Sequence, residues 1–141
     1  MTLNTYLFFD GNCAEAFDFY KGVFGGDFPM RMTYADAPAG MECAPGDKDK
    51  LMHVSLPVGG SVLMGSDFVA GRGEPPRPSN SFAISYNASS REDADAKFAA
   101  LRRDGGGAAM PMQDTFWGAY FGMLKDRFGV HWMINHDARG G

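Results

Sequence analysis

The amino-acid sequence predicts an α+β fold of two tandem βαβββ modules, whose strands form a curved, mostly antiparallel sheet around a cleft. Two segments, 13–24 and 91–103, place apolar residues at helical spacing, and strand-like runs precede and follow each of them. The two helices also match at one constant offset, which indicates two copies of one unit. This offset places Ala16 on Ala94, Tyr20 on Phe98 and Val23 on Leu101.

The first half is predicted to run strand, helix, strand, strand, strand. Aromatic and aliphatic residues indicate the first strand, and Gly25-Gly26 ends the helix. Alternation indicates the next strand, and Gly59-Gly60 joins the last two as a hairpin. The predicted strands cover residues 3–9, 28–34, 50–58 and 61–66. The loop 35–49 is longer than most connections, which suggests either a lid or binding loop or a tolerated surface insertion.

The second half repeats this order after a proline-rich linker over 68–79. Ser89-Ser90 offers a hydroxyl cap for the second helix, and Gly105-Gly106-Gly107 ends it. A short strand over 109–112 and an aromatic hairpin with its turn at 125–129 complete the module. The predicted strands of this half cover residues 81–87, 109–112, 117–122 and 130–135. We therefore expect a single domain over 1–141, with module 1 at about 1–67 and module 2 at about 80–137.

The composition excludes several classes of protein. A net charge of −4 and a pI near 5.2 argue against nucleic-acid binding, which requires clustered Lys and Arg. No apolar run is long enough for a membrane helix, and the N-terminus has no signal-peptide pattern, so a cytoplasmic protein is expected. Cys13 and Cys43 lack metal-ligand spacing and are interpreted as small buried or loop thiols.

Several motifs resemble one known family. They are Tyr6-Leu7-Phe8-Phe9-Asp10-Gly11-Asn12-Cys13, Ala16-Phe17-Asp18-Phe19-Tyr20, His53-Val54-Ser55-Leu56-Pro57, Leu63-Met64-Gly65-Ser66-Asp67, Gln113-Asp114-Thr115-Phe116-Trp117-Gly118 and Phe128 to Asn135. The sequence resembles the PhnB-like branch of the vicinal oxygen chelate superfamily, which has the glyoxalase/bleomycin resistance protein/dioxygenase fold. That branch is often labelled 3-demethylubiquinone-9 3-methyltransferase-like. The likeness covers nearly the whole chain apart from the loop and the linker.

The resemblance also implies where a metal would be held. Metalloenzymes of the superfamily place a His or Glu on each of four inner strands, and these positions fall here at Thr5, Met64, Ser81 and Met133. Hydroxyls and thioethers are poor ligands for an octahedral divalent ion, so no metal and no cofactor are expected. The alternative is a displaced metal site built on His53 and His131.

A ligand pocket is predicted on the inner face of the strands. Its candidate residues are Thr5, Leu7, Phe9, His53, Ser81, Ala83, Ser85, Gln113, Asp114, Trp117, His131, Met133 and Asn135. Aromatic rings with a few hydroxyls and an imidazole suit a small, flat, partly polar ligand. Two alternatives stay open: Phe116 and Trp117 could be core packing between modules, and Asp114 could be a turn former.

The sequence thus favours a metal-free small-molecule-binding protein, expected to be a homodimer. The alternative is a lyase, isomerase or dioxygenase that uses an unorthodox metal or His131 as general base. The methyltransferase label gains no support, because the glycine run 105–107 leads from helix to strand, whereas a nucleotide-type glycine turn leads from strand to helix.

Overall fold

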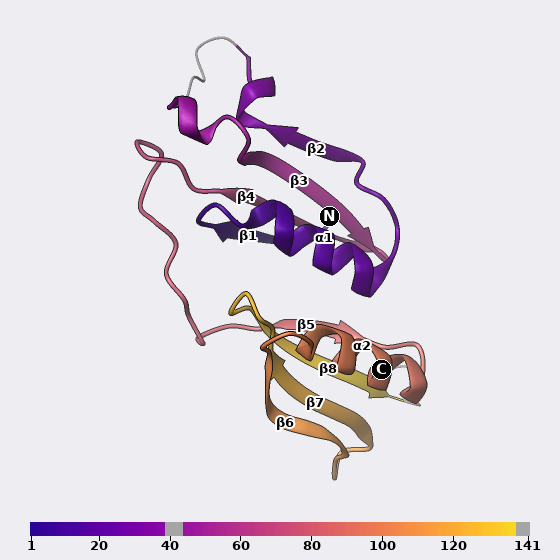
Figure 1. The fold of residues 1–141 in the computed structure, drawn as a ribbon. Helices are drawn as coiled ribbons and strands as arrows, with labels where there is room; N and C mark the ends of the chain where they lie inside the picture. Colours follow the sequence, from indigo (N-terminus) through magenta and orange to yellow (C-terminus); the bar gives the residue numbers. More distant parts are fainter. Residues whose placement is uncertain (39–43, 138–141) are drawn as a thin grey trace. The chain divides into compact units, whose positions relative to one another are not determined.

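The computed structural model describes residues 1–38 and 44–137 of the chain. The chain divides into two compact units, Met1–Arg77 and Pro78–Gly141, and the boundary lies within the predicted linker. Each unit contains one βαβββ module with its own four-stranded sheet, which agrees with the predicted α+β fold (Figure 1). The two units are described separately below as unit 1 and unit 2.

The described residues of unit 1 form one α-helix and four strands. Its elements are β1 (Thr5–Phe9), α1 (Cys13–Phe24), β2 (Met30–Thr33), β3 (Leu51–Val58) and β4 (Ser61–Asp67). The sheet order is β1-β4-β3-β2, in which β1 runs parallel to β4 and the other pairs are antiparallel. Two short 3-10 helices, Tyr34–Asp36 and Pro45–Asp47, lie in the predicted loop. Cys43 lies outside the described residues.

Helix α1 covers one face of this sheet. Its side chains Phe17 and Tyr20 are fully buried. The ring of Phe9, in β1, contacts the Phe17 ring edge-on, with centroids 6.2 Å apart. Gly65 of β4 permits this close approach, because a Cβ there would lie 2.6 Å from Cε2 of Phe17. Alternation along the strands adds Val54 to the same buried face.

Unit 2 repeats the arrangement. Its elements are β5 (Ile84–Asn87), α2 (Arg91–Arg102), β6 (Gly107–Asp114), β7 (Ala119–Lys125) and β8 (His131–Asp137). The sheet order is β5-β8-β7-β6, with β5 parallel to β8 and the remaining pairs antiparallel. Helix α2 packs on the face that carries the buried side chains Leu124, Trp132 and Ile134. The order of elements is thus the same in both units.

The helices follow the prediction closely, whereas some strand ends differ. Strand β5 begins at Ile84 and not at Ser81, because Ser81 bonds back to Ser79, with 3.2 Å between its backbone N and Oγ of Ser79. Strand β2 gives way to a 3-10 helix at Tyr34. Strand β6 is longer than predicted and β8 extends to Asp137. Among the described residues, no helix combines the length and apolar character that crossing a membrane requires.

Candidate functional site

Each sheet has a second face that its helix does not cover, here called the open face. Side chains alternate along a strand, so strand register assigns every residue to the helix side or to the open face. In unit 1 the open face carries Tyr6, Phe8, Met30, Met32, His53, Ser55 and Met64. In unit 2 it carries Ser85, Asn87, Met110, Gln113, Phe121, Met123, Lys125, His131, Met133 and Asn135. Both faces are rich in thioethers and in hydrogen-bonding groups.

An aromatic cluster lies on the open face of unit 1. The Tyr6 hydroxyl lies 3.1 Å from Nδ1 of His53, and the two rings stack with centroids 5.6 Å apart. Phe8 extends the cluster, with its ring centroid 5.1 Å from that of Tyr6, and is 65% exposed. The contact with Tyr6 occupies one nitrogen of the imidazole, so the other nitrogen is left for a ligand.

Methionines lie beside this cluster. Met32 pairs with His53 across the sheet, while Met30 pairs with Ser55 and Ser55 with Met64. Thioethers are flexible and polarisable and make favourable contacts with aromatic rings. This face therefore provides an adaptable apolar surface with one imidazole and one phenol as its directed polar groups.

On the open face of unit 2 the side chains form three parallel rows. A thioether row runs through Met110, Met123 and Met133, which are successive cross-strand partners. On one side of it lies an amide row, in which Asn135 donates a 3.3 Å hydrogen bond to Asn87. On the other side His131 pairs with Lys125 to form a basic row. Polar groups thus border an apolar strip on both sides.

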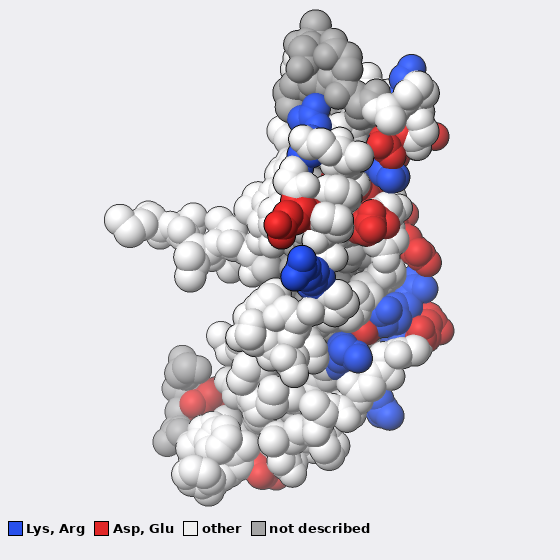
Figure 2. All heavy atoms as spheres, turned by 90° about the vertical axis from the view of Figure 1, so that its left-hand side faces the viewer, with Lys and Arg blue, Asp and Glu red and all other residues white. Residues whose placement is uncertain are grey.

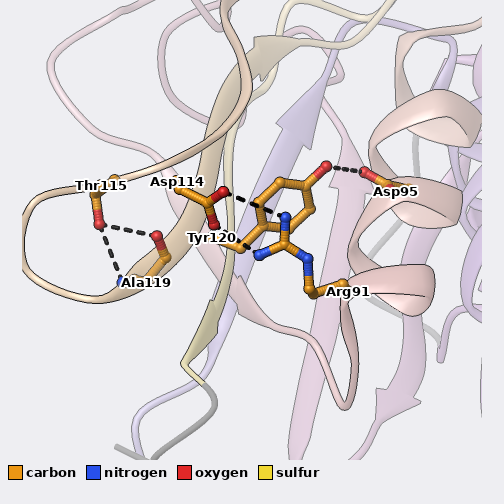
Figure 3. A network of polar contacts seen from close by, with 6 residues as sticks. All are labelled: Arg91, Asp95, Asp114, Thr115, Ala119 and Tyr120. Carbon is orange, nitrogen blue, oxygen red and sulfur yellow. Dashed lines mark hydrogen bonds and ion pairs between the residues drawn. The ribbon is translucent and has the colours of Figure 1, made fainter.

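A tight turn places aromatic rings beside this face. Thr115 donates from its hydroxyl to the Ala119 carbonyl at 2.9 Å, and the same hydroxyl accepts from the Ala119 N–H at 3.1 Å (Figure 3). The turn presents Trp117, whose ring centroid is 6.1 Å from that of Phe121. Phe116 is 97% exposed, and its packing between modules stays a prediction.

Asp114 does not join the open face. It accepts a 2.6 Å bond from Nη1 of Arg91, at the start of helix α2, and this bond lowers the pKa of the Asp114 carboxyl. The same guanidinium lies 3.9 Å from the centroid of the Tyr120 ring, and the Tyr120 hydroxyl donates to Asp95 (Figure 3). The network ties strands β6 and β7 to helix α2. Asp114 is therefore a structural residue of the helix side, and its predicted place at the pocket rim is wrong.

The predicted strand face of β1 is also wrong. Leu7 and Phe9 are buried on the helix side, and Thr5 shares their parity. Tyr6 and Phe8 occupy the open face in their place. Of the other candidates, Ser81 and Ala83 precede β5, whereas His53, Ser85, Gln113, His131, Met133 and Asn135 lie on open faces. Their role in binding stays a prediction.

Sequence reasoning missed several open-face residues. They are Tyr6, Phe8, Met30, Met32, Phe121, Met123, Met110 and Lys125. The signal for the pair in β2 was present, because Met30 and Met32 alternate with Arg31 and Thr33. For the hairpin of β7 and β8, pairing each strand residue with its partner would have placed Met123 beside Met133.

The donor set does not fit the divalent metal that the superfamily implies. Met64 and Met133 lie on the open faces and offer thioethers, while Thr5 offers a hydroxyl on the helix side and Ser81 offers one in the segment before β5. Within residues 1–38 and 44–137, no group of three or more His, Cys, Asp or Glu side chains is placed to hold a metal ion. Hard divalent ions prefer carboxylate and imidazole ligands, so we derive no chemistry through a metal.

Cys13 is not suited to nucleophilic chemistry. It is fully buried, and burial together with the nearby Asp67 carboxylate raises the pKa of its thiol. A thiol reacts as the thiolate, so a raised pKa makes Cys13 inert. On the face displayed in Figure 2, Lys and Arg are interspersed with Asp and Glu and form no patch of a single sign.

Two βαβββ modules, each with a helix on one face of its sheet and aromatic and thioether side chains on the other, define the architectural class. The model of the Glyoxalase/Bleomycin resistance protein/Dioxygenase superfamily matches residues 2–134, so the chain belongs to this superfamily. This confirms the resemblance inferred from the sequence.

Individual relatives cover nearly the whole chain. Protein PA1353 from Pseudomonas aeruginosa is 41% identical with a TM-score of 0.85, over 97% of this chain and 98% of that one. The putative 3-demethylubiquinone-9 3-methyltransferase PhnB protein from Bacillus cereus is 23% identical with a TM-score of 0.74, over 96% and 99%, which shows the shared fold. Protein YjdN of Escherichia coli K12 is 28% identical over 144 residues, 96% of this chain and 95% of that protein.

Proposed function

We propose that this chain is a PhnB-like small-molecule-binding protein that holds its ligand on the open sheet faces without the divalent metal of its metalloenzyme relatives. One observation carries the proposal: the superfamily's ligand positions hold Thr5, Met64, Ser81 and Met133, whereas the open faces hold aromatic rings and thioethers. Such surfaces recognise ligands through stacking and a few directed hydrogen bonds.

The contacts in unit 1 support a flat, partly polar ligand. Tyr6 and His53 hold each other in a fixed orientation through their 3.1 Å contact and their stacked rings. A ring laid against Phe8 would extend this stack, and the remaining nitrogen of His53 would hydrogen-bond to it. Pre-formed contacts of this kind reduce the entropy that is lost on binding.

Native mass spectrometry combined with metal analysis tests the proposal. Protein purified without chelator is expected to carry an organic adduct and far less than one divalent ion per chain. His53→Ala is expected to weaken retention of the adduct, while His136→Ala serves as the control, because His136 faces away and bonds the Ala88 carbonyl at 2.9 Å. One divalent ion per chain that disappears in His53→Ala or His131→Ala would contradict the proposal.

We also propose that the chain forms a homodimer. Large apolar side chains stand exposed in both units, including Leu3 at 96% in unit 1 and Phe82 and Phe116 at 59% and 97% in unit 2. Closed two-fold pairs are the commonest way to cover such groups. Light scattering is expected to give twice the chain mass of 15.3 kDa, and a value near 15.3 kDa at micromolar concentration would contradict the proposal.

A second candidate function is His-assisted catalysis, as in a lyase or isomerase. It is favoured by the position of His131 on the open face of unit 2, directly across from Lys125. Imidazole titrates near neutrality and serves as a general base when a substrate proton comes within reach. Full turnover by His131→Ala on an identified substrate would remove His131 from this role.

A further inference from the structure

The three rows on the open face of unit 2 differ in the chemistry they offer. The basic row contains His131 and Lys125, the thioether row Met133 and Met123, and the amide row Asn135. Successive rows are two residues apart along β8, so the basic and amide rows are separated by about 13 Å. A ligand that touches all three rows must be elongated, with different ends.

The basic row favours a negative charge at one end of the ligand. Neither Lys125 nor His131 forms an ion pair with any acid in the described part of the chain, whereas Lys97 and Arg91 are paired with Asp93 and Asp114. An unpaired ammonium beside an imidazole favours an anion, and a carboxylate can accept from both donors at once.

The thioether row favours an uncharged middle part of the ligand. Met123 and Met133 are half-buried and carry no charge, and Phe121 lies next to Met123 on the same face. Sulfur atoms make favourable contacts with aromatic rings, and the long flexible side chains adapt to ring systems of different shape. An aromatic body is therefore favoured over a charged or strongly hydrated one.

The amide row favours a neutral polar group at the other end of the ligand. The Asn135 amide donates to Asn87 at 3.3 Å, which orients both groups and leaves an acceptor oxygen on Asn135. Gln113 pairs with Phe121 at the other end of this row and adds a second amide. Such groups recognise a hydroxyl or amide substituent, not a second charge.

We propose that the open face of unit 2 binds an elongated aromatic carboxylate, with its carboxylate at Lys125 and His131, its rings over the methionines and a neutral polar substituent at Asn135. The proposal rests on the proposed binding function and names the ligand class.

Calorimetric titration with two matched probes tests it: 4′-hydroxybiphenyl-4-carboxylate and the corresponding neutral carboxamide. The carboxylate is expected to bind about tenfold more tightly, since a charge-assisted bond is stronger than a neutral one. The double variant Lys125→Gln/His131→Gln is expected to abolish this preference, by lowering the affinity for the carboxylate to that for the carboxamide. Lys48→Gln is the charge-matched control, because Lys48 is exposed in unit 1.

Equal affinity for the two probes, or a preference that survives the double variant, would overturn the inference. The inference would also be overturned if the double variant changed the mass measured by light scattering but not the affinity for the probes. A second copy of the chain would then cover this face. Lack of binding by both probes overturns the inference alone when the native mass spectrum still shows an organic adduct. Lack of both binding and adduct overturns the proposed function as well.

Discussion

The helices α1 and α2 are held at their N-termini in different ways. At α2 the cap is local: Oγ of Ser90 accepts from the Asp93 N–H at 2.9 Å. At α1 the residue in the cap position, Asn12, makes no such bond. The buried carboxylate of Asp67, from the end of β4, instead accepts from the N–H of Cys13 at 2.9 Å. The helix N-terminus is therefore capped by a neighbouring residue in unit 2 and by a residue distant in the sequence in unit 1.

The open faces differ in a parallel way. Unit 1 presents an aromatic cluster around Tyr6 and His53, whereas unit 2 presents methionines bordered by amides on one side and by Lys125 and His131 on the other. The two units share one arrangement of sheet and helix but differ in the side chains of their open faces. The sheet and helix therefore supply the scaffold, while the open-face side chains determine the chemistry.

The largest expected effect is the loss of the distant cap. Oδ1 of Asp67 accepts from Gly11 and Cys13, and Oδ2 accepts from Leu51, each at 2.9 Å. Asp67→Ala would leave the buried N–H groups of Cys13 and Leu51 without partners, at a cost of about 3–5 kcal/mol in the free energy of unfolding. Urea denaturation measures it, with the exposed Asp10→Ala as control.

The buried carboxylate of unit 2 provides the counterpart. Asp126 accepts from the backbone of Phe128 and Val130 and from Nε1 of Trp132. Two of these donors lie in a turn that water can reach, so Asp126→Ala is expected to cost less, about 2–3 kcal/mol. A larger loss in the free energy of unfolding for Asp126→Ala than for Asp67→Ala would contradict the view that Asp67, which binds donors distant in the sequence, contributes more to stability.

A smaller difference is expected at two glycines that face the helices. A Cβ at Gly65 would lie 2.6 Å from Cε2 of the buried Phe17, and a Cβ at Gly122 would lie 2.6 Å from Sδ of Met112. Gly65→Ala is expected to cost about 1–3 kcal/mol, because overpacking against a buried ring forces the ring to shift. Gly122→Ala should cost less, since its shortest contact is with a flexible thioether, while the Phe98 ring lies farther away, with Cε2 at 3.0 Å. Thermal unfolding compares them, and the reverse order would refute this view of the packing.

The smallest effect concerns the helix caps themselves. Ser90→Ala removes a bond to the helix N-terminus and is expected to lower the free energy of unfolding by about 1 kcal/mol. Asn12→Ala removes no cap bond and should change it by less than about 0.5 kcal/mol. Equal losses in urea titrations of the two variants would show that Asn12 caps α1 in solution.

Elements with a local signal were predictable from the sequence. The first helix has the predicted bounds Cys13–Phe24, and the Ser89-Ser90 pair does contain the cap of α2. Periodicity and capping depend on residues a few positions apart, so they can be recognised without the fold. The role of Asp67 could not be recognised, because its donors are 16 to 56 residues away.

The faces of the strands were predictable only where polarity alternates. Strand β1 reads Thr5-Tyr6-Leu7-Phe8-Phe9, which is apolar on both sides, so nothing local distinguishes the helix side from the open face. In β6, register shifts before and after Met110 change which residues share a face. Asp114 bonds Arg91 on the helix side, a contact between residues 23 positions apart that no local pattern indicates. His131, Met133 and Asn135 alternate with the buried Trp132 and Ile134, so periodicity alone places the three on one face.

The central claim is that this superfamily member binds an organic ligand on its open faces without a divalent metal. Native mass spectrometry of protein purified without chelator, with metal content measured on the same sample, tests it most directly. The account predicts an organic adduct that is lost on unfolding and a divalent ion content far below one per chain. One divalent ion per chain, released together with any adduct when His53 or His131 is replaced by alanine, would contradict it.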